Sequence, residues 1–303
     1  MKRRTFIRQG GLVSFGIATG LHNAAFYKPK VSTLTILHTN DVHSRIEAFP
    51  QDGSRYAGLG GVAKRAKLIE KIRKEQENVL LLDAGDIFQG TPYFNFFGGE
   101  LEFKLMSEMG YDAATIGNHD FDAGIDGLNK QMHLASFEVI NCNYNFDNTV
   151  MNGKVSPYKI FQKGDIKVGV LGVGIELDSL VPKSLFKETQ YQDPIKQANK
   201  YATILKKDLG CHYVICLSHL GYKYKENKVS DHDLAADTQN IDLILGGHTH
   251  TFLKKPTIIG NLVGKEVYVN QVGWAGIVLG QMQVNFEKNF KCKCVSCNPK
   301  TIR

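Results

Sequence analysis

The chain has 303 residues, of which 43% are hydrophobic and 22% charged, so it can form one large domain or two small ones around a sizeable core. Its net charge of +7 does not indicate a nucleic-acid-binding face, because Lys2, Arg3, Arg4 and Arg8 gather at the amino terminus instead of lining a folded surface. We therefore exclude nucleic acid as the expected partner.

Residues 1–25 are similar to a twin-arginine export signal. Arg3 and Arg4 precede Phe6, and an apolar stretch follows at 11–21. That stretch is shorter than the roughly 20 residues that a membrane-spanning helix needs, so it predicts a signal peptide and no stable membrane anchor. The expected location is the periplasm. The alternative is an amphipathic or disordered amino terminus.

Six cysteines divide into two sets. The first set lies in or beside apolar, strand-like runs, where a cysteine usually behaves as a small buried hydrophobe; it comprises Cys142, Cys211 and Cys216. The second set is a C-x-C-x2-C pattern near the carboxyl end, with too few thiols for a four-cysteine zinc site; it comprises Cys292, Cys294 and Cys297. A disulfide within the second set is an open alternative, and its pairing cannot be read from the sequence.

Three short apolar runs in the first half predict buried strands, at 34–37, 79–82 and 113–116. Each run ends in polar residues that can bind a metal or move a proton. In chain order these residues are Asp41 and His43, then Asp86, then Asn118, His119, Asp120 and Asp122. Asp41 and His43 are two positions apart, so both side chains can face one ion in an extended loop.

The segments between these strands read mainly as helices. Residues 62–75 have the apolar spacing of an amphipathic helix, and 125–135 also predict a helix. The stretch 92–109 is helix-like and aromatic, and we expect its large side chains in the core; they are Phe94, Phe97, Phe103, Leu105 and Met109. A strand is expected at 138–140 and a polar loop at 143–156.

A second series of strands occupies the other half. Strands are expected at 166–173, 213–218, 241–245 and 267–271, an antiparallel strand at 277–286, and a helix at 194–209. Two of these strands lead directly into histidines. His219 follows the run ending at Ser218, and His248 and His250 follow the run ending at Leu245.

All these candidate ligands thus follow apolar strands. An α/β sheet gathers the carboxyl ends of its parallel strands along one rim, so the five tips are expected to meet at one site. Carboxylates, imidazoles and an amide without cysteine suit two divalent ions such as zinc, manganese, iron or cobalt. The sequence therefore predicts a two-metal centre.

The order of the motifs resembles the calcineurin-like metallophosphoesterases. D-x-H, G-D-x-x-x-G, G-N-H-D/E, a lone histidine and G-H-x-H follow one another as in that family. Asn40 to Arg45 and Gly117 to Asp122 make the chain similar to the catalytic domain of bacterial periplasmic 5′-nucleotidases, over about residues 33–286. The expected fold is an α/β four-layer α/β/β/α sandwich of two mixed sheets, since two strand series meet at one set of tips.

The resemblance also implies roles for individual residues. One metal would be held by Asp41, His43 and His250, and the second by Asn118, His219 and His248, with Asp86 bridging both ions. His119 and Asp122 would form a catalytic pair, which makes Asp120 the weaker candidate for the acid.

The implied activity is metal-dependent hydrolysis of nucleotides or related phosphate esters. Hydrolysis of sulfur esters, as in thiosulfohydrolases of the same superfamily, another phosphodiesterase activity, and an inactive metal-binding subunit are the alternatives. The last alternative predicts a damaged ligand set, whereas every ligand position here is filled.

One departure from the family concerns substrate binding. The nucleotidases of the family carry a carboxyl-terminal domain that supplies arginines for the phosphate and aromatic residues for the base. Here the catalytic segment is followed by 287–303, a short cysteine-containing tail. We therefore expect little discrimination among nucleobases and a separately encoded 5′-nucleotidase carboxyl-terminal domain protein as a partner.

Overall fold

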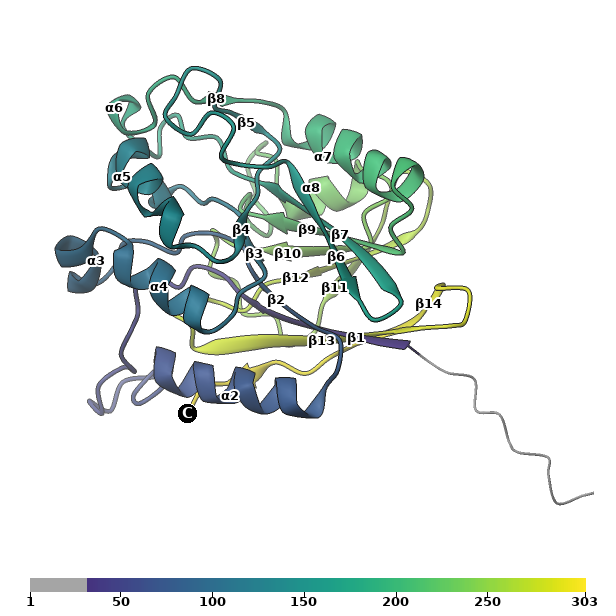
Figure 1. The fold of residues 1–303 in the computed structure, drawn as a ribbon, viewed down its shortest axis with the longest axis horizontal. Coiled ribbons are helices and arrows are strands. Elements are labelled where there is room, and N and C mark those ends of the chain that lie inside the picture. The colour runs from purple at the N-terminus through teal and green to yellow at the C-terminus, as the bar shows by residue number, and fades with distance from the viewer. Residues whose placement is uncertain (1–31) are drawn as a thin grey trace, which may run out of the picture.

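The computed structural model describes residues 32–303, so the predicted signal peptide at 1–25 lies outside the described residues. Two mixed β-sheets pack face to face, and helices cover their outer faces (Figure 1). Within the described part of the chain, no helix is both long enough and apolar enough to cross a membrane. The predicted α/β/β/α sandwich is confirmed.

The first sheet has the strand order β14-β13-β1-β2-β3-β4, with β15 paired to β13. Its parallel part consists of β1 to β4, whereas β13 is antiparallel to β1. The bounds are β1 Ser32–Thr39, β2 Val79–Asp83, β3 Ala113–Ala114, β4 Glu138–Val139, β13 Val278–Phe286, β14 Cys292–Cys297 and β15 Lys300–Thr301. The predicted antiparallel strand is thus found at the expected place.

The second sheet has the order β11-β12-β10-β9-β7-β6, with parallel pairing from β12 through β7 and antiparallel strands at both edges. Its strands are β6 Tyr158–Lys163, β7 Ile166–Val173, β9 Tyr213–Ser218, β10 Leu243–Gly246, β11 Thr257–Gly260 and β12 Glu266–Asn270. In a separate two-stranded sheet, β5 Tyr144–Asn145 pairs with β8 Gln190–Tyr191. β5 lies within the predicted polar loop at 143–156, and β8 lies after it in the chain.

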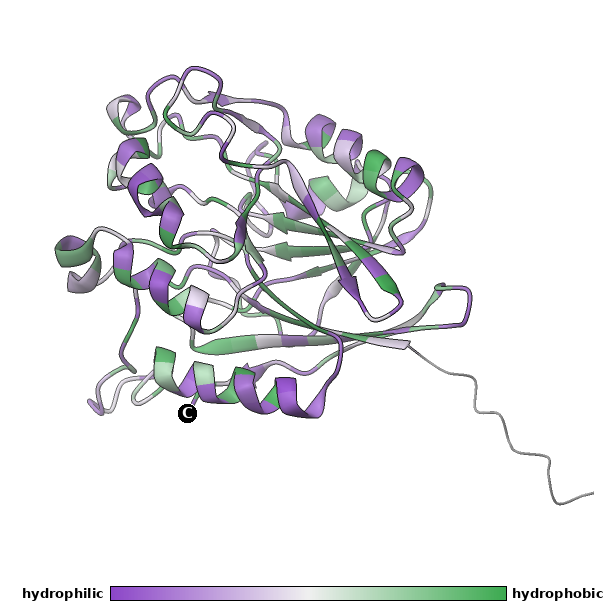
Figure 2. Ribbon diagram, in the orientation of Figure 1, coloured by the Kyte–Doolittle hydropathy of each residue, from purple (hydrophilic) through white to green (hydrophobic). Residues whose placement is uncertain are grey.

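Three apolar clusters hold the layers together. Inward side chains of both sheets, such as Leu80 and Ile215, form the middle cluster. The helices α2 Val62–Glu75, α4 Glu100–Glu108 and α5 Gly124–Gln131 cover the first sheet, and α7 Pro194–Thr203 and α8 Asp231–Ala236 cover the second. Figure 2 shows the central strands as hydrophobic and the helices as two-faced, which is the pattern expected for a sandwich.

The aromatic segment 92–109 differs from its prediction in two respects. Gly98 and Gly99 both have positive φ, at 58° and 92°, so the chain breaks into α3 Pro92–Phe97 and α4. Phe103 and Met109 are buried as expected, but Phe97 is 48% exposed and does not belong to the core. The prediction for Phe97 is wrong because α3 ends before the glycine pair and lies at the rim of the molecule (Figure 1).

Two further details extend the predicted elements. The helix predicted at 194–209 ends as α7 at Thr203 and continues as one π-helical turn, Ile204–Asp208, and α5 is followed by a 3₁₀ turn, Met132–Leu134. A short helix, α6 Lys183–Phe186, was not predicted. Cys142, Cys211 and Cys216 are buried as expected.

The segment 287–303 is part of the first sheet. β14 pairs along β13 from Met282 to Phe286, and β15 pairs with β13 at Val278 and Leu279. Ile302 is 2% exposed and joins the core beneath α2, where its carbonyl accepts the amide of Gly60. These residues therefore extend the sheet at β13, the neighbour of β1, and β1 leads into the candidate site.

Candidate metal centre

The polar residues after five strands meet at the carboxyl ends of the parallel strands of the two sheets. Two groups of side chains there could each hold a metal ion, since their ligand atoms lie within 4.8 Å of one another: Asp41, His43 and His250 in one group, and Asp86, His219 and His248 in the other. The tips come from β1, β2, β9 and β10, with β3 adding Asn118 and His119. The structure thus brings together every ligand candidate of the sequence analysis.

The first group contains two imidazoles whose nitrogens face each other. Nε2 of His43 lies 3.0 Å from Nε2 of His250, and Oδ1 of Asp41 lies 3.4 Å from the latter nitrogen. The other nitrogen of His43 donates to the carbonyl of Phe88 at 3.3 Å, so its Nε2 is left with a lone pair. A ring nitrogen with a free lone pair that faces a second imidazole nitrogen beside a carboxylate fits a bound cation.

The second group is centred on His219, whose side chain is fully buried. Its Nδ1 donates to the carbonyl of Ala84 at 2.7 Å, which directs Nε2 toward Oδ2 of Asp86 at 3.1 Å. This Nε2 makes no hydrogen bond within the described residues. A buried ring nitrogen without a partner, facing a carboxylate, is the donor arrangement of a metal ligand whose tautomer is fixed by a backbone carbonyl.

Asp86 lies between the two groups. Its Oδ2 is 3.1 Å from His219 and 3.8 Å from Nε2 of His43, so one carboxylate reaches both. Oδ1 of Asn118 lies 2.9 Å from Nδ1 of His248, which adds the amide to the second group. The donor set of four imidazoles, two carboxylates and an amide fits two divalent cations of the zinc, manganese, iron or cobalt kind.

The electrostatics of the centre favour positive charge. Burial by itself lowers the pKa of His219, but the carboxylates of Asp86 and Asp41 outweigh it and raise that pKa to about 10. Burial lowers the pKa of His248 to about 4, so its ring is neutral and can act as a ligand at neutral pH. The pKa of Asp86 lies below its usual value, because His219 and His43 overcome the effect of its burial.

The ligand loops have an unusual backbone. Asp41, His43, Asp86, His248 and His250 all have φ between 50° and 71°, a region that residues with a Cβ rarely adopt. Hydrogen bonds hold the first two loops in this form, for example from the amide of Asp41 to the carbonyl of Gly85 at 2.9 Å. Strain of this kind concentrates at functional sites, where the surrounding structure enforces it.

Asp120 connects the loop after β2 to the loop after β3 through its buried carboxylate. It is 2% exposed, and its carboxylate accepts the amides of Asp86, Ile87, Phe88 and Gly117 at 2.8 to 3.1 Å. Four backbone donors leave this side chain no free role at the site. The preference for Asp122 over Asp120 as the partner of the catalytic histidine is consistent with this geometry.

His119 lies beside the ligand groups and pairs with Asp122. Nδ1 of His119 is 2.8 Å from Oδ2 of Asp122, and the backbone amide of His119 donates to Oδ1 of Asp86 at 2.8 Å. The bond from Asp122 raises the pKa of His119, which favours the protonated ring. The side chain of His119 is 38% exposed and that of His250 is 40% exposed, whereas those of Asp86 and His219 are 2% and 0% exposed, so His119 and His250 are open to a substrate.

Sequence reasoning missed the residues that support the ligands. Asn40 donates to Oδ2 of Asp41 at 2.6 Å and to the carbonyl of Gly273 at 2.6 Å, which ties β1 to the loop after β12. Gln271 donates to the carbonyl of Gly247 at 2.6 Å and accepts the amide of Thr251 at 3.0 Å, so it brackets the loop that carries His248 and His250.

These supporting residues differ in how visible they are in the sequence. Gln271 is the polar last residue of the strand predicted at 267–271, so a signal close to the one that found the ligands applies to it. Asp231 carries no such signal, because it begins α8, which was not predicted. Its buried carboxylate accepts the hydroxyl of Ser218 at 2.6 Å, directly before His219.

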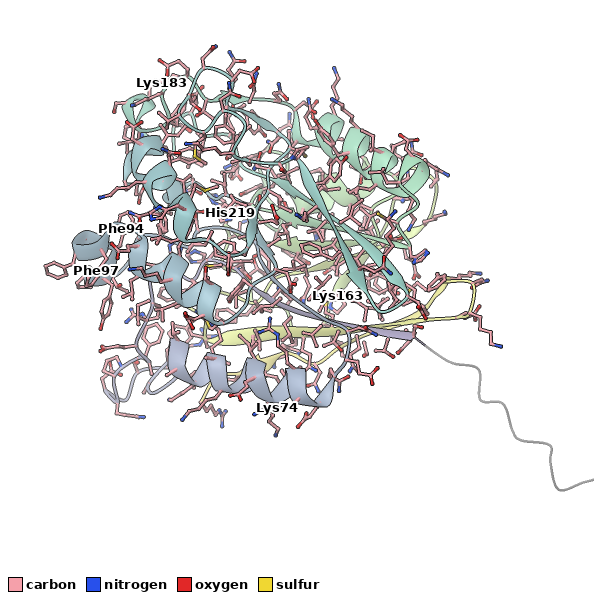
Figure 3. All side chains as sticks on the ribbon, in the orientation of Figure 1. Lys74, Phe94, Phe97, Lys163, Lys183 and His219 are labelled. Carbon is pink, nitrogen blue, oxygen red and sulfur yellow. The ribbon has the colours of Figure 1, made fainter. Side chains whose placement is uncertain are left out.

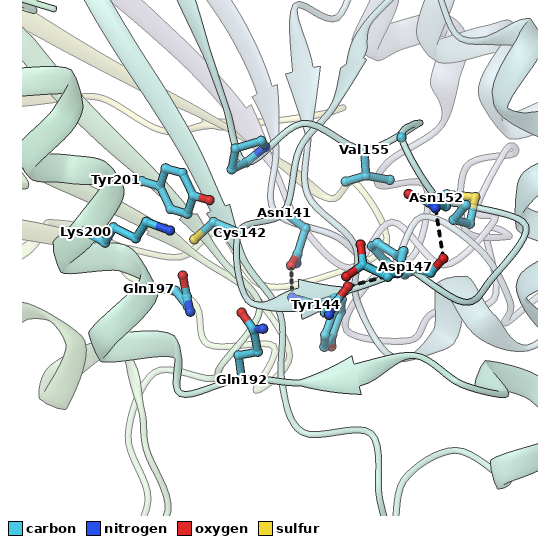
Figure 4. Close-up of a pocket in the computed structure, with 15 residues that line it drawn as sticks. Asn141, Cys142, Tyr144, Asp147, Asn152, Val155, Gln192, Gln197, Lys200 and Tyr201 are labelled. Carbon is cyan, nitrogen blue, oxygen red and sulfur yellow. Dashed lines mark hydrogen bonds between the residues drawn. The ribbon is translucent and has the colours of Figure 1, made fainter.

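A polar cavity of about 370 Å³ lies elsewhere, between α7 and the segment that follows β4 (Figure 4). Asn141, Tyr144, Lys200 and Tyr201 are among its lining residues, and no candidate ligand is. The carboxamide oxygen of Asn141 accepts the amides of Asn143 and Tyr144 at 3.0 and 2.8 Å, which shapes the cavity wall. This cavity is therefore separate from the metal centre.

Comparison with known proteins agrees with this geometry. The family model described as calcineurin-like phosphoesterase matches residues 34–252. The chain is 34% identical over 286 residues to the snake venom 5′-nucleotidase of Gloydius brevicauda, a match that covers 88% of this chain and 47% of that protein. The chain spans about half the length of the curated relatives it matches.

Two solved structures are similar throughout most of the chain. The 5′-nucleotidase precursor of Thermus thermophilus superposes with a TM-score of 0.81 at 30% identity, covering 89% of this chain and 55% of that one. The NAD nucleotidase of Haemophilus influenzae gives a TM-score of 0.78 at 28% identity, with 90% and 57% covered.

Proposed function

We propose that this chain, which belongs to the calcineurin-like phosphoesterases, is a dinuclear metal-dependent hydrolase of the 5′-nucleotidase type that acts on nucleotides or related phosphate esters. The observation that carries the proposal is the convergence of two His/Asp groups on Asp86, with the unpartnered Nε2 of His219 facing it. Fold alone would not support an activity, but this site chemistry does.

The proposed ligand assignment follows the two groups. Asp41, His43 and His250 hold one ion, Asn118, His219 and His248 hold the other, and Asp86 contacts both. Two such ions, when bound, would polarise the phosphoryl oxygens and lower the pKa of a water for in-line attack on phosphorus. The protein's own contribution is to fix the donors, since buried hydrogen bonds orient His219, His43 and Asp41 in advance.

His119 supplies the proton-transferring group in this proposal. Because the carboxylate of Asp122 accepts from Nδ1, the Nε2–H of the protonated ring is free to donate to a phosphoryl oxygen or to the leaving oxygen. The hydrogen bond to Asp122 raises the pKa of His119, which favours the protonated ring. An inactive metal-binding subunit would not need a proton-transferring pair such as His119 and Asp122.

A hydrolysis screen tests the proposal. The metal-reconstituted full chain is assayed against nucleoside monophosphates, cyclic nucleotides, sugar nucleotides, aryl phosphates and thiosulfate esters. Metal-dependent release of phosphate from monoesters supports a 5′-nucleotidase-type activity. Exclusive action on diesters would indicate a phosphodiesterase, and exclusive action on sulfur esters would indicate a thiosulfohydrolase. The absence of any hydrolysis would contradict the proposed hydrolase function.

We also propose that a separate 5′-nucleotidase carboxyl-terminal domain protein completes substrate selection. The support is the similarity to relatives named 5′-nucleotidase. Adding such a domain to the assay should increase kcat/KM for one nucleotide relative to the others. An unchanged substrate profile would contradict the partnership.

Export to the periplasm is proposed from the sequence of residues 1–25. Replacing both Arg3 and Arg4 by lysine should retain the protein in the cytoplasm if the twin-arginine route is used. Fractionation of cells that express each form measures this. Equal periplasmic recovery of the two forms would contradict the proposed route.

A further inference from the structure

His250 differs from His43 and His219 in how its ring is held. Its side chain is 40% exposed, whereas His219 is fully buried and lies well inside the molecule (Figure 3). A backbone carbonyl bonds to Nδ1 of His43 and another to Nδ1 of His219, but no group in the described part of the chain bonds to Nδ1 of His250. Histidines that bind metals normally have their second nitrogen hydrogen-bonded, which orients the ring, so His250 lacks the usual support from the protein.

The ring of His250 lies instead against Trp274, the one tryptophan of the chain. The ring centroids are 5.7 Å apart and the ring planes differ by 6°, which is an offset-stacked arrangement. In this orientation Nε2 of His250 lies 3.0 Å from Nε2 of His43 and 3.4 Å from Oδ1 of Asp41. The stack therefore holds the ring where its nitrogen faces the other two members of the first ligand group.

The loop that carries Trp274 is tied to the ligand loops on both sides of the tryptophan. The amide of Ala275 donates to the carbonyl of Asp41 at 2.7 Å, and the amide of Gly273 donates to the carbonyl of Thr251 at 3.0 Å. The first bond reaches a candidate ligand, and the second reaches the loop after β10 that carries the paired histidines. Trp274 is thus fixed relative to the residues that it could orient.

Two further aromatic rings contact the indole of Trp274 edge to face. The ring centroid of Phe49 lies 5.8 Å away at an interplanar angle of 74°, and that of Tyr56 lies 6.2 Å away at 81°. Both rings belong to the segment between β1 and α2. An indole packed against two rings has little freedom to turn, so it offers His250 a rigid surface.

We propose that Trp274 is a positioning residue that holds His250 ready for its ion and thereby sets the affinity of the first ligand group for a divalent cation. The second group does not depend on Trp274, because the carbonyl of Ala84 orients His219. Trp274 acts through the histidine and has no role in the chemical step. The inference rests on the proposed function through its metal assignment alone.

Zinc titration of the metal-free full chain by calorimetry measures the affinity of both groups. Trp274→Ala should weaken one of the two binding steps by about 3- to 10-fold, the range expected for the loss of an aromatic stack, and leave the other step unchanged. The unchanged step also checks folding, since the second group spans both sheets. Trp274→Phe keeps a ring beside His250 and should restore most of the affinity.

Tyr56→Leu is the matched control for this titration. It removes a ring that contacts Trp274 but does not stack on His250. Both zinc affinities of this variant should equal those of the unaltered chain. Equal affinities in the unaltered chain, Tyr56→Leu and Trp274→Ala would overturn the inference.

The emission of Trp274 shows which binding step belongs to the first group. Because the chain has one tryptophan, its emission should change as zinc fills the group that contains His250 and stay constant during the other step. His250→Ala should abolish this response. An emission response that is the same in His250→Ala would overturn the inference.

A double-substitution cycle distinguishes action through His250 from general packing of the loop. In the His250→Ala background, the further change Trp274→Ala should not weaken zinc binding any more, because the ring that the indole supports is gone. An equal loss in both backgrounds would contradict the proposed role. Absence of hydrolysis together with the expected zinc affinities would instead overturn the proposed function and leave this inference standing.

Discussion

Oδ2 of Asp86 lies 3.1 Å from Nε2 of His219, and this contact joins the two sheets at their carboxyl edges. Asp86 follows β2 of the first sheet, and His219 follows β9 of the second. A centre assembled across a sandwich in this way depends on how the sheets pack as well as on its ligands. The middle apolar cluster, which includes Leu82 and Leu217, therefore helps to set the metal geometry.

His119 and Asp122 should act on rate and not on metal content. His119→Ala is expected to lower kcat by about 10²- to 10⁴-fold, as for loss of a general acid, while the chain keeps its metals. Metal analysis of the purified variant beside its kinetics checks this. The loss of one ion per chain would make His119 a ligand. Asp122→Asn should give a smaller defect, because the ring remains but its pKa is no longer raised.

Replacing Asp120 should destabilise both ligand loops. Asp120→Asn replaces one carboxylate oxygen by an NH2 group, and because each oxygen accepts two backbone amides, two of the four amides lose their acceptor. A loss of about 1–3 kcal/mol in the free energy of unfolding is expected, together with weaker metal binding. Urea denaturation measures it against Asp126→Asn, an aspartate with a 57% exposed side chain. Equal stability of the two variants would contradict the structural role.

Much of this arrangement could be predicted from the sequence, because it depends on local patterns. Apolar β-branched runs such as 166–173 and 213–218 coincide with β7 and β9, and 62–75 coincides with α2. Polar residues directly after such runs must lie at strand ends, so the candidate metal ligands could be predicted one strand after another. The motif order then suggested how they are shared between two ions.

What the sequence did not show depends on tertiary packing. Edge strands such as β11 and β14 lack a continuous apolar run, because one face or edge is exposed to water. The exposure of Phe96 and Phe97 also escaped prediction, since a phenylalanine in a helix-like stretch has the same local pattern whether it faces a core or solvent. The glycine pair that ends α3 decides whether these phenylalanines face the core or the solvent.

His38 should make the protein less stable in acid. Burial lowers the pKa of His38 to about 3, whereas an unfolded histidine titrates near 6.5, so the unfolded chain binds more protons between these values. The stability contribution is present above about pH 6.5 and declines as the pH falls. Between pH 7 and pH 5 it should amount to about 2 kcal/mol.

A glutamine at this position provides the comparison. Urea midpoints of the chelated protein at both pH values should differ less in His38→Gln than in the unaltered chain, because glutamine does not titrate. His133→Gln is the control, since His133 is exposed. A pH dependence that is the same in all three proteins would show that His38 does not contribute to it.

Two ions sharing the carboxylate of Asp86 are the core of the proposed mechanism, and metal content measured together with activity tests this most directly. The purified chain should bind two divalent ions, lose hydrolysis on chelation, and regain it with manganese, cobalt or zinc. Asp86→Asn should reduce occupancy of both positions and lower activity more than His43→Asn, because Asp86 contacts both groups whereas His43 belongs to one. Undiminished hydrolysis by Asp86→Asn after removal of all metal would contradict the two-metal mechanism.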